Sequence, residues 1–274
     1  MNALFRQLPD FKGKQRLAKV LFRKDLAFGR DIQVKGKYGC NYLLPNLIEN
    51  VSQEIFINGI YEKATSDFCV GRLGNGSIFL DLGANIGAIS VPVYKKKSDT
   101  KIICVEAAPW LSPYLRKNLE LNGMNDVTLI SKALFNTDNQ EIDFFSPDEK
   151  FGKGSLSPTY TNKAVKVKTI RLDTLVEELK LPRVDLIKID VEGYEYFVFN
   201  GAERLLSGQD APDILFEFED WAEELAKIAP GSAQSYLLEK GYKLFQLDAR
   251  SALHPLTHPL TKGSTMLLAT KKDH

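Results

Sequence analysis

Short apolar runs alternate with amphipathic stretches from residue 77 onward. A strand that is apolar on both faces must be covered on both faces, so this alternation predicts a parallel sheet with helices on both sides. The apolar runs that we expect to be strands are residues 77–82, 101–106, 127–133, 184–190, 214–219, 242–247 and 265–270. Amphipathic patterns predict intervening helices at residues 110–122, 194–206 and 232–240.

Two regions depart from this alternation. Residues 141–145 and 164–170 alternate apolar and polar positions as paired strands do, and the link 146–163 is rich in Ser, Pro, Gly and Lys. This pattern predicts an inserted β-hairpin that carries a long loop. Residues 249–263 show no helical pattern, so the last strand should run antiparallel to its predecessor. The expected α/β fold is therefore a seven-stranded, mostly parallel sheet with an antiparallel last strand.

The N-terminal segment differs from the rest in charge. Residues 1–30 carry eight basic and two acidic side chains, whereas the whole chain of 274 residues has a net charge of only +1. That overall balance argues against nucleic-acid binding. Residues 11–30 predict a basic amphipathic helix, so we expect a helical arm or lid at residues 1–50 beside a domain at residues 51–274. The charged face is either solvated on an arm packed against the core, or it contacts a membrane surface or an acidic glycan.

Composition places the chain among ordinary globular proteins, with 44% hydrophobic and 26% charged residues. No apolar run reaches the roughly 18 residues that a membrane-spanning helix needs. The first residues carry charges where a signal peptide is apolar. The three cysteines (Cys40, Cys69 and Cys104) are odd in number and lack metal-ligand spacing. A reduced, cytoplasmic setting is therefore expected.

The sequence IFLDLGANIG, which starts at Ile78, is a buried strand running into a glycine-bearing turn, with a helix expected from about residue 88. Such a turn lets backbone N–H groups approach a ligand closely. Glu106 ends the next strand, where a carboxylate can accept both hydroxyls of a ribose. Asn85 stands where a dinucleotide loop has its second glycine, which leaves less room for a pyrophosphate. The loop therefore favours a ligand with adenine and ribose but no bridging phosphates, such as S-adenosylmethionine.

A second charged motif is VDLIKIDVEG at residues 184–193, in which Lys188, Asp190 and Glu192 share one face of a strand. Charged side chains at the carboxyl edge of a central strand are costly unless they meet a ligand or each other. Asp190 or Glu192 could act as a general base, with Lys188 as an electrostatic partner. Alternatively, the acids could hold a divalent cation that polarises a substrate hydroxyl.

Three more acids end neighbouring strands. Asp81 could order the glycine loop or contact the ammonium of a methionine moiety. Glu217 and Glu219 could reach the same cleft, or they could be a solvated strand end.

These motifs together resemble the FkbM-like methyltransferases, a family of S-adenosylmethionine-dependent enzymes with a Rossmann-like, class I methyltransferase sheet. The resemblance covers about residues 50–220, and one departure is Ala107, where the family often has proline. The matching stretches and positions are 56–62, 81–87, Glu106, Pro109, Leu115, Asn118, Asn122, Ala133, 172–175, 184–193, Gly201, Ala202 and Glu217.

The resemblance implies a cofactor, a set of residues that bind it, and an activity. The cofactor is S-adenosylmethionine, and the residues expected to bind it are Glu62, Asp81, Gly83, Ala84, Asn85, Gly87, Glu106 and Ala133. Glu106 would hold the ribose and Ala133 would lie near adenine. The implied reaction is methyl transfer to a hydroxyl oxygen, often of a sugar or polyketide, with Asp190 or Glu192 accepting the proton.

The sequence does not identify the acceptor of the methyl group, although a polysaccharide or glycosylated metabolite fits the resemblance. Bases in the long loop (Lys150, Lys153 and Lys163) favour an anionic acceptor. Two alternatives remain open, an NAD(P)-linked oxidoreductase on a similar sheet and a non-catalytic scaffold that kept the fold. Tyr236 and Lys240 have the Tyr-x-x-x-Lys spacing of short-chain dehydrogenases, although far from the central strands.

Overall fold

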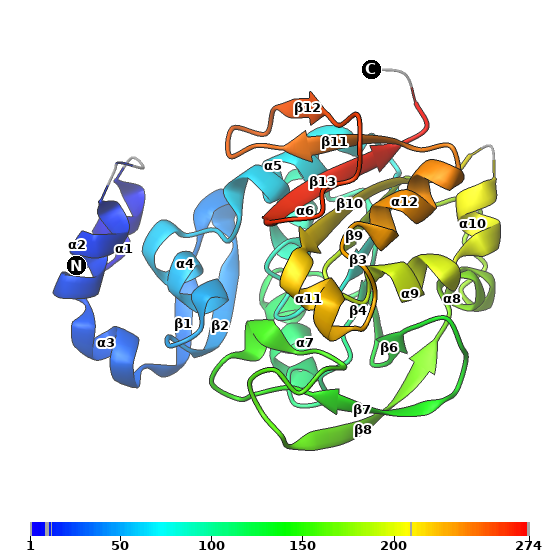
Figure 1. Ribbon diagram of the computed structural model, residues 1–274. Helices are drawn as coiled ribbons and strands as arrows, with labels where there is room; N and C mark the ends of the chain where they lie inside the picture. Colours follow the sequence, from blue (N-terminus) through cyan, green and yellow to red (C-terminus); the bar gives the residue numbers. More distant parts are fainter. Residues whose placement is uncertain (1, 9–10, 12, 209, 273–274) are drawn as a thin grey trace.

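The computed structural model describes residues 2–8, 11, 13–208 and 210–272. A sheet of eight strands forms its centre, in the order β12-β11-β13-β10-β9-β3-β4-β5, and helices cover both faces (Figure 1). The strands are β3 (Ile78–Leu82), β4 (Lys101–Val105), β5 (Thr128–Ile130), β9 (Leu186–Ile189), β10 (Asp213–Glu219), β11 (Lys243–Leu247), β12 (Leu253–Pro255) and β13 (Ser264–Thr270).

The strand directions confirm the predicted class of sheet. Strands β5, β4, β3, β9 and β10 are parallel, and β13 is antiparallel to both of its neighbours, β10 and β11. The predicted number of seven strands is wrong. The connection at residues 249–263 folds back as the short strand β12, which pairs with β11 at the edge and adds an eighth.

The inserted hairpin is also present. Strands β7 (Glu141–Phe145) and β8 (Ala164–Ile170) are antiparallel and have the predicted bounds. They belong to a separate three-stranded sheet with β6 (Ala133–Leu134). The apolar run at residues 127–133 was expected to be one strand, but it divides between β5 and β6 because the chain leaves the central sheet after Ile130.

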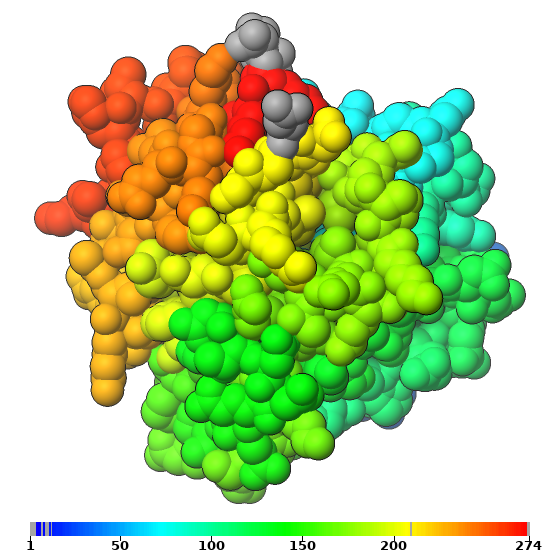
Figure 2. All heavy atoms as spheres, turned by 90° about the vertical axis from the view of Figure 1, so that its right-hand side faces the viewer, coloured from blue at the N-terminus to red at the C-terminus, as the bar shows by residue number. Residues whose placement is uncertain are grey.

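The central strands bury both faces, as an apolar run predicts. Phe79 and Leu186 face one core, which is covered by α5 (Lys63–Arg72), α6 (Ser90–Lys96) and α7 (Ser112–Leu121). Leu80 and Ile187 face the other core. Its helices are α8 (Leu172–Glu178), α9 (Glu195–Asn200), α10 (Glu203–Ser207) and α12 (Ser232–Glu239), most of which lie on the side seen in Figure 2. Helix α11 (Asp220–Leu225) follows β10 directly.

One predicted helix, at residues 194–206, is interrupted in the structure. A Cβ atom on Gly201 would lie 2.4 Å from the carbonyl oxygen of Phe135, so the backbone approaches its neighbour closely there. Helix α9 therefore ends at Asn200, and α10 begins only at Glu203.

The N-terminal segment holds more than the expected helix. Its elements are α1 (Asn2–Gln7), α2 (Lys14–Leu21), α3 (Arg23–Phe28), β1 (Arg30–Lys35), the 3₁₀ turn η1 (Lys37–Gly39), β2 (Asn41–Asn46) and α4 (Asn50–Asn58). The single amphipathic helix predicted at residues 11–30 is wrong because Phe22, at φ −112° and ψ 25°, breaks it into α2 and α3. Strands β1 and β2 form a hairpin. The division between residues 1–50 and 51–274 stays a prediction. Among the described residues, no helix is both long and apolar enough to cross a bilayer.

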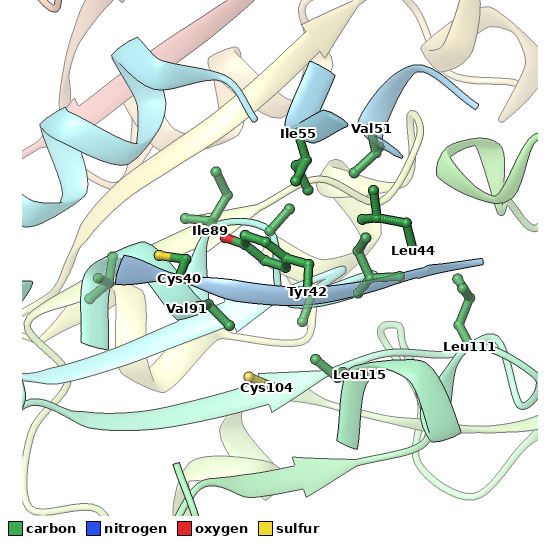
Figure 3. Packing of buried hydrophobic residues seen from close by; sticks show 14 of the residues in the cluster. Cys40, Tyr42, Leu44, Val51, Ile55, Ile89, Val91, Cys104, Leu111 and Leu115 are labelled. Atoms are coloured by element: carbon green, nitrogen blue, oxygen red, sulfur yellow. The ribbon is translucent and has the colours of Figure 1, made fainter. Parts of the chain in front are cut away.

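Strand β2 joins this segment to the rest of the molecule. Tyr42 and Leu44 lie in a buried cluster with Ile55 of α4 and with Ile89 and Leu115 (Figure 3). These contacts bury large apolar side chains from both parts of the chain, so they hold the hairpin against α6 and α7.

Asn118 of α7 and Asn122, the residue that follows this helix, complete the hydrogen bonding of β2. The Asn118 amide accepts from the N–H of Leu43 at 2.6 Å and donates to the carbonyls of Leu43 at 3.3 Å and Ile86 at 2.9 Å. The Asn122 amide pairs in the same way with the backbone of Asn41, at 2.9 and 2.7 Å. Each side-chain amide thus makes the two backbone hydrogen bonds that a neighbouring strand would otherwise make with one residue of β2.

We predict that Asn118→Ala lowers the free energy of unfolding by roughly 2–4 kcal/mol, because it leaves buried backbone groups unpaired. Chemical denaturation would measure the loss. The matched control is Asn125→Ala, which changes an exposed asparagine between α7 and β5. Its free energy of unfolding should stay within about 0.5 kcal/mol of the wild type. Equal stability of the two variants would show that the asparagine pairs do not hold β2.

Candidate active site

A cavity opens at the carboxyl edge of β3, β4 and β9, with about 620 Å³ of empty space when the open solvent at its mouth is included. This is the edge at which open parallel sheets bind ligands. Six of the residues predicted from sequence line it, namely Gly83, Asn85, Glu106, Ala133, Asp190 and Glu192. The other predicted residues do not line the cavity, namely Glu62, Asp81, Ala84, Gly87 and Lys188. Of these, Lys188 contacts Asp190, which does line it.

The turn after β3 requires its glycine. Gly83 has φ 76°, and a Cβ atom there would lie 1.9 Å from the carbonyl oxygen of Asp190. The ends of β3 and β9 therefore touch through their backbones. Asn85 follows with φ 53°, a left-handed conformation that asparagine tolerates better than most residues. The helix expected from about residue 88 begins at Ser90.

The Glu106 carboxylate is fixed by backbone groups on both sides. One oxygen accepts from the N–H of Asn85 and the other from the N–H of Ala108, each at 2.8 Å. Burial raises the pKa of Glu106, and the two N–H donors oppose that shift. An ionised carboxylate has about four acceptor sites, so each oxygen keeps one for a hydroxyl in the cavity.

A buried lysine lies between the ends of the two central strands. The Lys188 ammonium is 3.4 Å from Oδ2 of Asp190 and 4.0 Å from Oδ1 of Asp81. Burial lowers the pKa of Lys188, but the carboxylates of Asp190 and Asp81 raise it by more, so the ammonium stays charged. Asp81 also accepts a hydrogen bond from the Ser90 hydroxyl at 2.5 Å.

Three carboxylate oxygens at this place are buried and lack a hydrogen-bond partner among the described residues. They are Oε2 of Glu62, Oδ1 of Asp81 and Oδ1 of Asp190. Burial raises the pKa of Glu62 and of Asp81. Glu62 also adopts φ 39°, a strained conformation for a non-glycine residue. Buried acceptors without donors are rare, and a cationic ligand group would satisfy them.

The predicted common face of Lys188, Asp190 and Glu192 is only partly correct. Strand β9 ends at Ile189, and Glu192 has φ 55°, so its side chain leaves the strand pattern. Its carboxylate instead pairs with the Lys153 ammonium of the inserted loop, at 3.0 Å. Burial and the nearby Asp190 raise the pKa of Glu192 to about 8, although Lys153 opposes the shift.

Glu192 also lines a second, smaller cavity, which in this conformation has no room for a water molecule. The inserted loop and α11 form its walls, with Lys153, Ser155, Ser157, Thr159, Tyr160, Trp221, Ala222 and Leu225. Oε2 of Glu219 lies 3.9 Å from the Lys153 ammonium. Burial, followed by the carboxylates of Asp190, Glu219 and Glu192, raises the pKa of Glu217 to about 10. Both strand-end acids therefore belong to the same electrostatic cluster.

Several lining residues were not predicted as site residues. The 3₁₀ turn η2 (Phe151–Lys153) folds over the glycine loop, and the Asn85 amide donates to the Phe151 carbonyl at 3.3 Å. Phe144, Gly154 and Leu156 of the same insertion line the larger cavity. The sequence feature that could have indicated these residues is the Ser-, Pro-, Gly- and Lys-rich composition of the loop at residues 146–163. Within the described part of the chain, no three or more His, Cys, Asp or Glu side chains are grouped so as to hold a metal ion.

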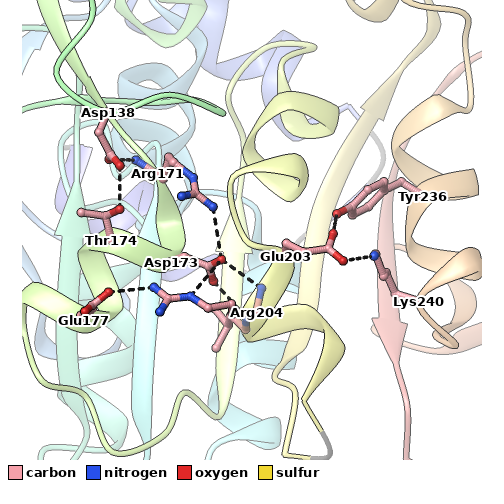
Figure 4. A network of polar contacts seen from close by, with 10 residues as sticks. Asp138, Arg171, Asp173, Thr174, Glu177, Glu203, Arg204, Tyr236 and Lys240 are labelled. Carbon is pink, nitrogen blue, oxygen red and sulfur yellow. Dashed lines mark hydrogen bonds and ion pairs between the residues drawn. The ribbon is translucent and has the colours of Figure 1, made fainter.

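The acid in the matching stretch at residues 172–175 has a structural role. Asp173 is buried and accepts from the N–H groups of Arg204 and Leu205 at 2.9 and 3.0 Å, at the start of α10 (Figure 4). The carboxylate thus satisfies the first N–H donors of that helix.

Tyr236 and Lys240 are engaged outside the cavities. Both contact the Glu203 carboxylate of α10 (Figure 4), and the Tyr236 hydroxyl donates to it at 2.6 Å. Neither side chain lines either cavity at the carboxyl edge. The dehydrogenase-like spacing therefore has a packing explanation.

The sequence model of the family described as the methyltransferase FkbM domain matches residues 81–244 of this chain. The chain belongs to the FkbM methyltransferase family. One relative is Methyltransferase sdnD of Sordaria araneosa, 28% identical over 179 residues that span 53% of this chain and 68% of the relative. Another is Methyltransferase 1 of Beauveria bassiana, 27% identical over 175 residues, which span 57% and 68% of the two chains. This FkbM-family methyltransferase uses S-adenosylmethionine. The Asp190 carboxylate lines the cavity and keeps one oxygen without a hydrogen-bond donor among the described residues, which fits a cofactor that carries cationic groups.

Solved methyltransferase structures are more distant. A precorrin-6y C5,15-methyltransferase from Geobacter metallireducens is 15% identical, with a TM-score of 0.45 over 77% of this chain and 87% of the other. A putative methyltransferase from Streptococcus mutans, in complex with S-adenosylhomocysteine, is 10% identical with a TM-score of 0.44 over 75% and 94%.

Proposed function

We propose that this FkbM-family protein transfers the methyl group to a hydroxyl oxygen of a sugar, within a polysaccharide or a glycosylated metabolite. The observation that supports this most is the position of Glu192, which lines both the larger cavity and the smaller one beside it. A carboxylate at that boundary can accept a proton from an alcohol as the alcohol meets the methyl group.

In this proposal the larger cavity holds the cofactor. The free acceptor sites of Glu106 take the two ribose hydroxyls, and Ala133 lies beside adenine. Asp190 is suited to the α-ammonium group of the methionine moiety, because it lines this cavity and its Oδ1 has no hydrogen-bond partner among the described residues. Glu62 and Asp81 add negative charge near Asp190, although neither lines the cavity. Gly83, Ala84, Asn85 and Gly87 form the turn around that moiety. When bound, S-adenosylmethionine supplies an activated methyl group.

Glu192 is the proposed general base, with Asp190 as its alternative. A base works best when its pKa is near the working pH, and the pKa of Glu192 is raised to about 8. The hydroxyl oxygen forms a bond to the methyl carbon, the carbon–sulfur bond breaks with its electron pair going to sulfur, and the hydroxyl proton goes to the Glu192 carboxylate. Lys188 holds Asp190 in place, and the inserted loop excludes water from above.

The smaller cavity is the proposed acceptor site, and the inserted loop and α11 must move apart to admit a sugar, because the cavity has no room for a water molecule in this conformation. It combines the aromatic rings of Tyr160 and Trp221 with the hydroxyls of Ser155, Ser157 and Thr159, a combination suited to a polyol. Lys153 lies between Glu192 and Glu219, so its charge is already balanced. These contacts favour a neutral acceptor over the anionic one suggested by the lysines of the loop.

The sequence alternatives have less support. Asn85 stands in the place of a dinucleotide-loop glycine, and Tyr236 and Lys240 are engaged with Glu203. A scaffold without activity does not account for strained acids such as Glu62 and Glu192. The cytoplasmic setting also stays a proposal, supported by three buried cysteines that are all free thiols.

We predict that Glu106→Ala weakens S-adenosylhomocysteine binding by about 10- to 100-fold, because charge-assisted hydrogen bonds to the ribose are lost. Isothermal titration calorimetry would measure the change. The control variant Glu120→Ala removes an exposed carboxylate of α7 and should bind S-adenosylhomocysteine with the affinity of the wild type. Unchanged affinity in Glu106→Ala, with the fold intact by circular dichroism, would contradict the ribose assignment.

A labelled methyl group from S-adenosylmethionine should appear as a methyl ether when the enzyme is incubated with glycan fractions or neutral methyl glycosides. Mass spectrometry and NMR of the product would locate the new bond. An O-methyl ether stable to mild base supports the proposal. A methylated nitrogen or carbon, a methyl ester, or no transfer in spite of cofactor binding would contradict it.

We predict that Glu192→Gln lowers the turnover number by roughly 10²- to 10⁴-fold while S-adenosylhomocysteine binding is kept. In the wild type, the carboxylate is protonated below its pKa, so the rate should rise with pH and level off above about 8. Burial also raises the pKa of Glu195 to about 8, but Glu195 lines neither cavity, so Glu195→Gln is the matched control. If Glu195→Gln removed the pH dependence and Glu192→Gln kept it, the base assignment would be wrong.

A further inference from the structure

The N-terminal helices α2 and α3 expose a large apolar surface. Four side chains form it, with exposed fractions of 43% for Leu17, 74% for Val20, 52% for Leu21 and 80% for Phe28. In α2 the first three are spaced i, i+3 and i+4, so they share one face of the helix. An exposed aromatic and three exposed aliphatic side chains on one short segment are unusual for a surface that only meets water.

A different face of the same helices packs against the protein. Ala18, Phe22 and Leu26 are buried, and the Phe22 ring meets the Phe56 ring of α4 edge-on at 5.9 Å. Packing on the core therefore accounts for this face only. The apolar face with Leu17 and Val20 is left without a partner among the described residues. Helices α2 and α3 lie at the end of the molecule away from α8 and α10 (Figure 1).

Basic side chains flank the exposed apolar face. Arg16, Lys19, Arg23 and Lys24 are exposed and form no ion pair with a described residue, whereas Asp25 is the one acidic side chain within α2 and α3. With the buried Lys14, five positive charges and one negative charge give α2 and α3 a net charge of +4. Cations beside exposed apolar side chains are typical of helices that lie at the surface of an anionic bilayer, with the apolar side chains between the headgroups.

We propose that α2 and α3 dock this protein on an anionic phospholipid surface, with Leu17, Val20, Leu21 and Phe28 inserted and the four bases at the headgroups. Nucleic acid fits less well because a phosphate backbone offers no partner for the aliphatic and aromatic side chains. The docking is independent of the chemistry proposed above, since none of these residues lines either cavity.

The docking segment is connected to the loop that covers the active site. Arg30, just after α3, lies 3.6 Å from the Glu149 carboxylate, and the Asn46 amide donates to the Asp148 carbonyl at 3.0 Å. The next turn along that loop is η2, whose Phe151 lines the larger cavity. A docked arm would therefore hold the cavity entrance close to the bilayer.

Co-sedimentation with vesicles tests the proposal. The full chain should sediment with vesicles of phosphatidylcholine and phosphatidylglycerol, more weakly at high salt, and should stay in solution with phosphatidylcholine alone. Val20→Glu and Phe28→Glu should each reduce binding by at least about tenfold, and Lys19→Gln or Arg23→Gln by about fivefold. Leu238→Glu places the same charge on another exposed apolar residue, in α12, and should bind vesicles like the wild type.

All variants should keep their circular dichroism spectrum and their affinity for S-adenosylhomocysteine, which separates docking from folding. Equal binding to both kinds of vesicle, no binding to either, or unchanged binding of Val20→Glu would overturn the proposal. So would light scattering that shows a dimer converted to a monomer by Val20→Glu, because the apolar face would then join two copies of the chain.

Discussion

A lysine buried at the centre of a parallel sheet determines how the candidate site is built. In the register of β3 and β9, Asp81 lies directly beside Lys188, and Asp190 follows two residues later. An ammonium in that position needs carboxylates around it, since an unpaired buried charge is very costly. The carboxylates outnumber this one cation, so acceptor oxygens remain unpaired at the edge where a ligand enters. The same pairing therefore stabilises the strand ends and prepares a place for a positively charged group.

The sequence predicted the parts that depend on local pattern. Apolar runs located seven of the eight strands of the central sheet, and the alternating pattern gave the bounds of β7 and β8 without error. The strand–glycine–helix motif located the ligand edge, because Gly83 is required by a backbone contact that only glycine permits. Glu106 and Asp190 were found by the same reasoning, since the carboxyl ends of parallel strands meet at one edge.

The parts that depend on distant contacts could not be predicted. Glu192 was assigned to a strand face, but its left-handed conformation turns it toward Lys153, which lies 39 positions earlier in a loop without regular pattern. The break at Phe22 separates α2 from α3 within a run that is helical throughout by propensity. Strand β12 forms because its partner β11 offers an open edge, and three residues carry too little pattern to show that.

The acidic cluster links stability to ligand binding through pH. Glu192 and Glu217 have folded pKa values of about 8 and about 10, above the 4.5 of an exposed glutamate. The folded state therefore holds their protons more tightly than the unfolded state does. Stability is unaffected below pH 4.5 and falls as the pH rises through the interval up to those values. A cationic ligand near these carboxylates lowers their pKa and recovers part of that loss. Binding of a positively charged cofactor therefore lowers the electrostatic cost of keeping these carboxylates close together in the folded state.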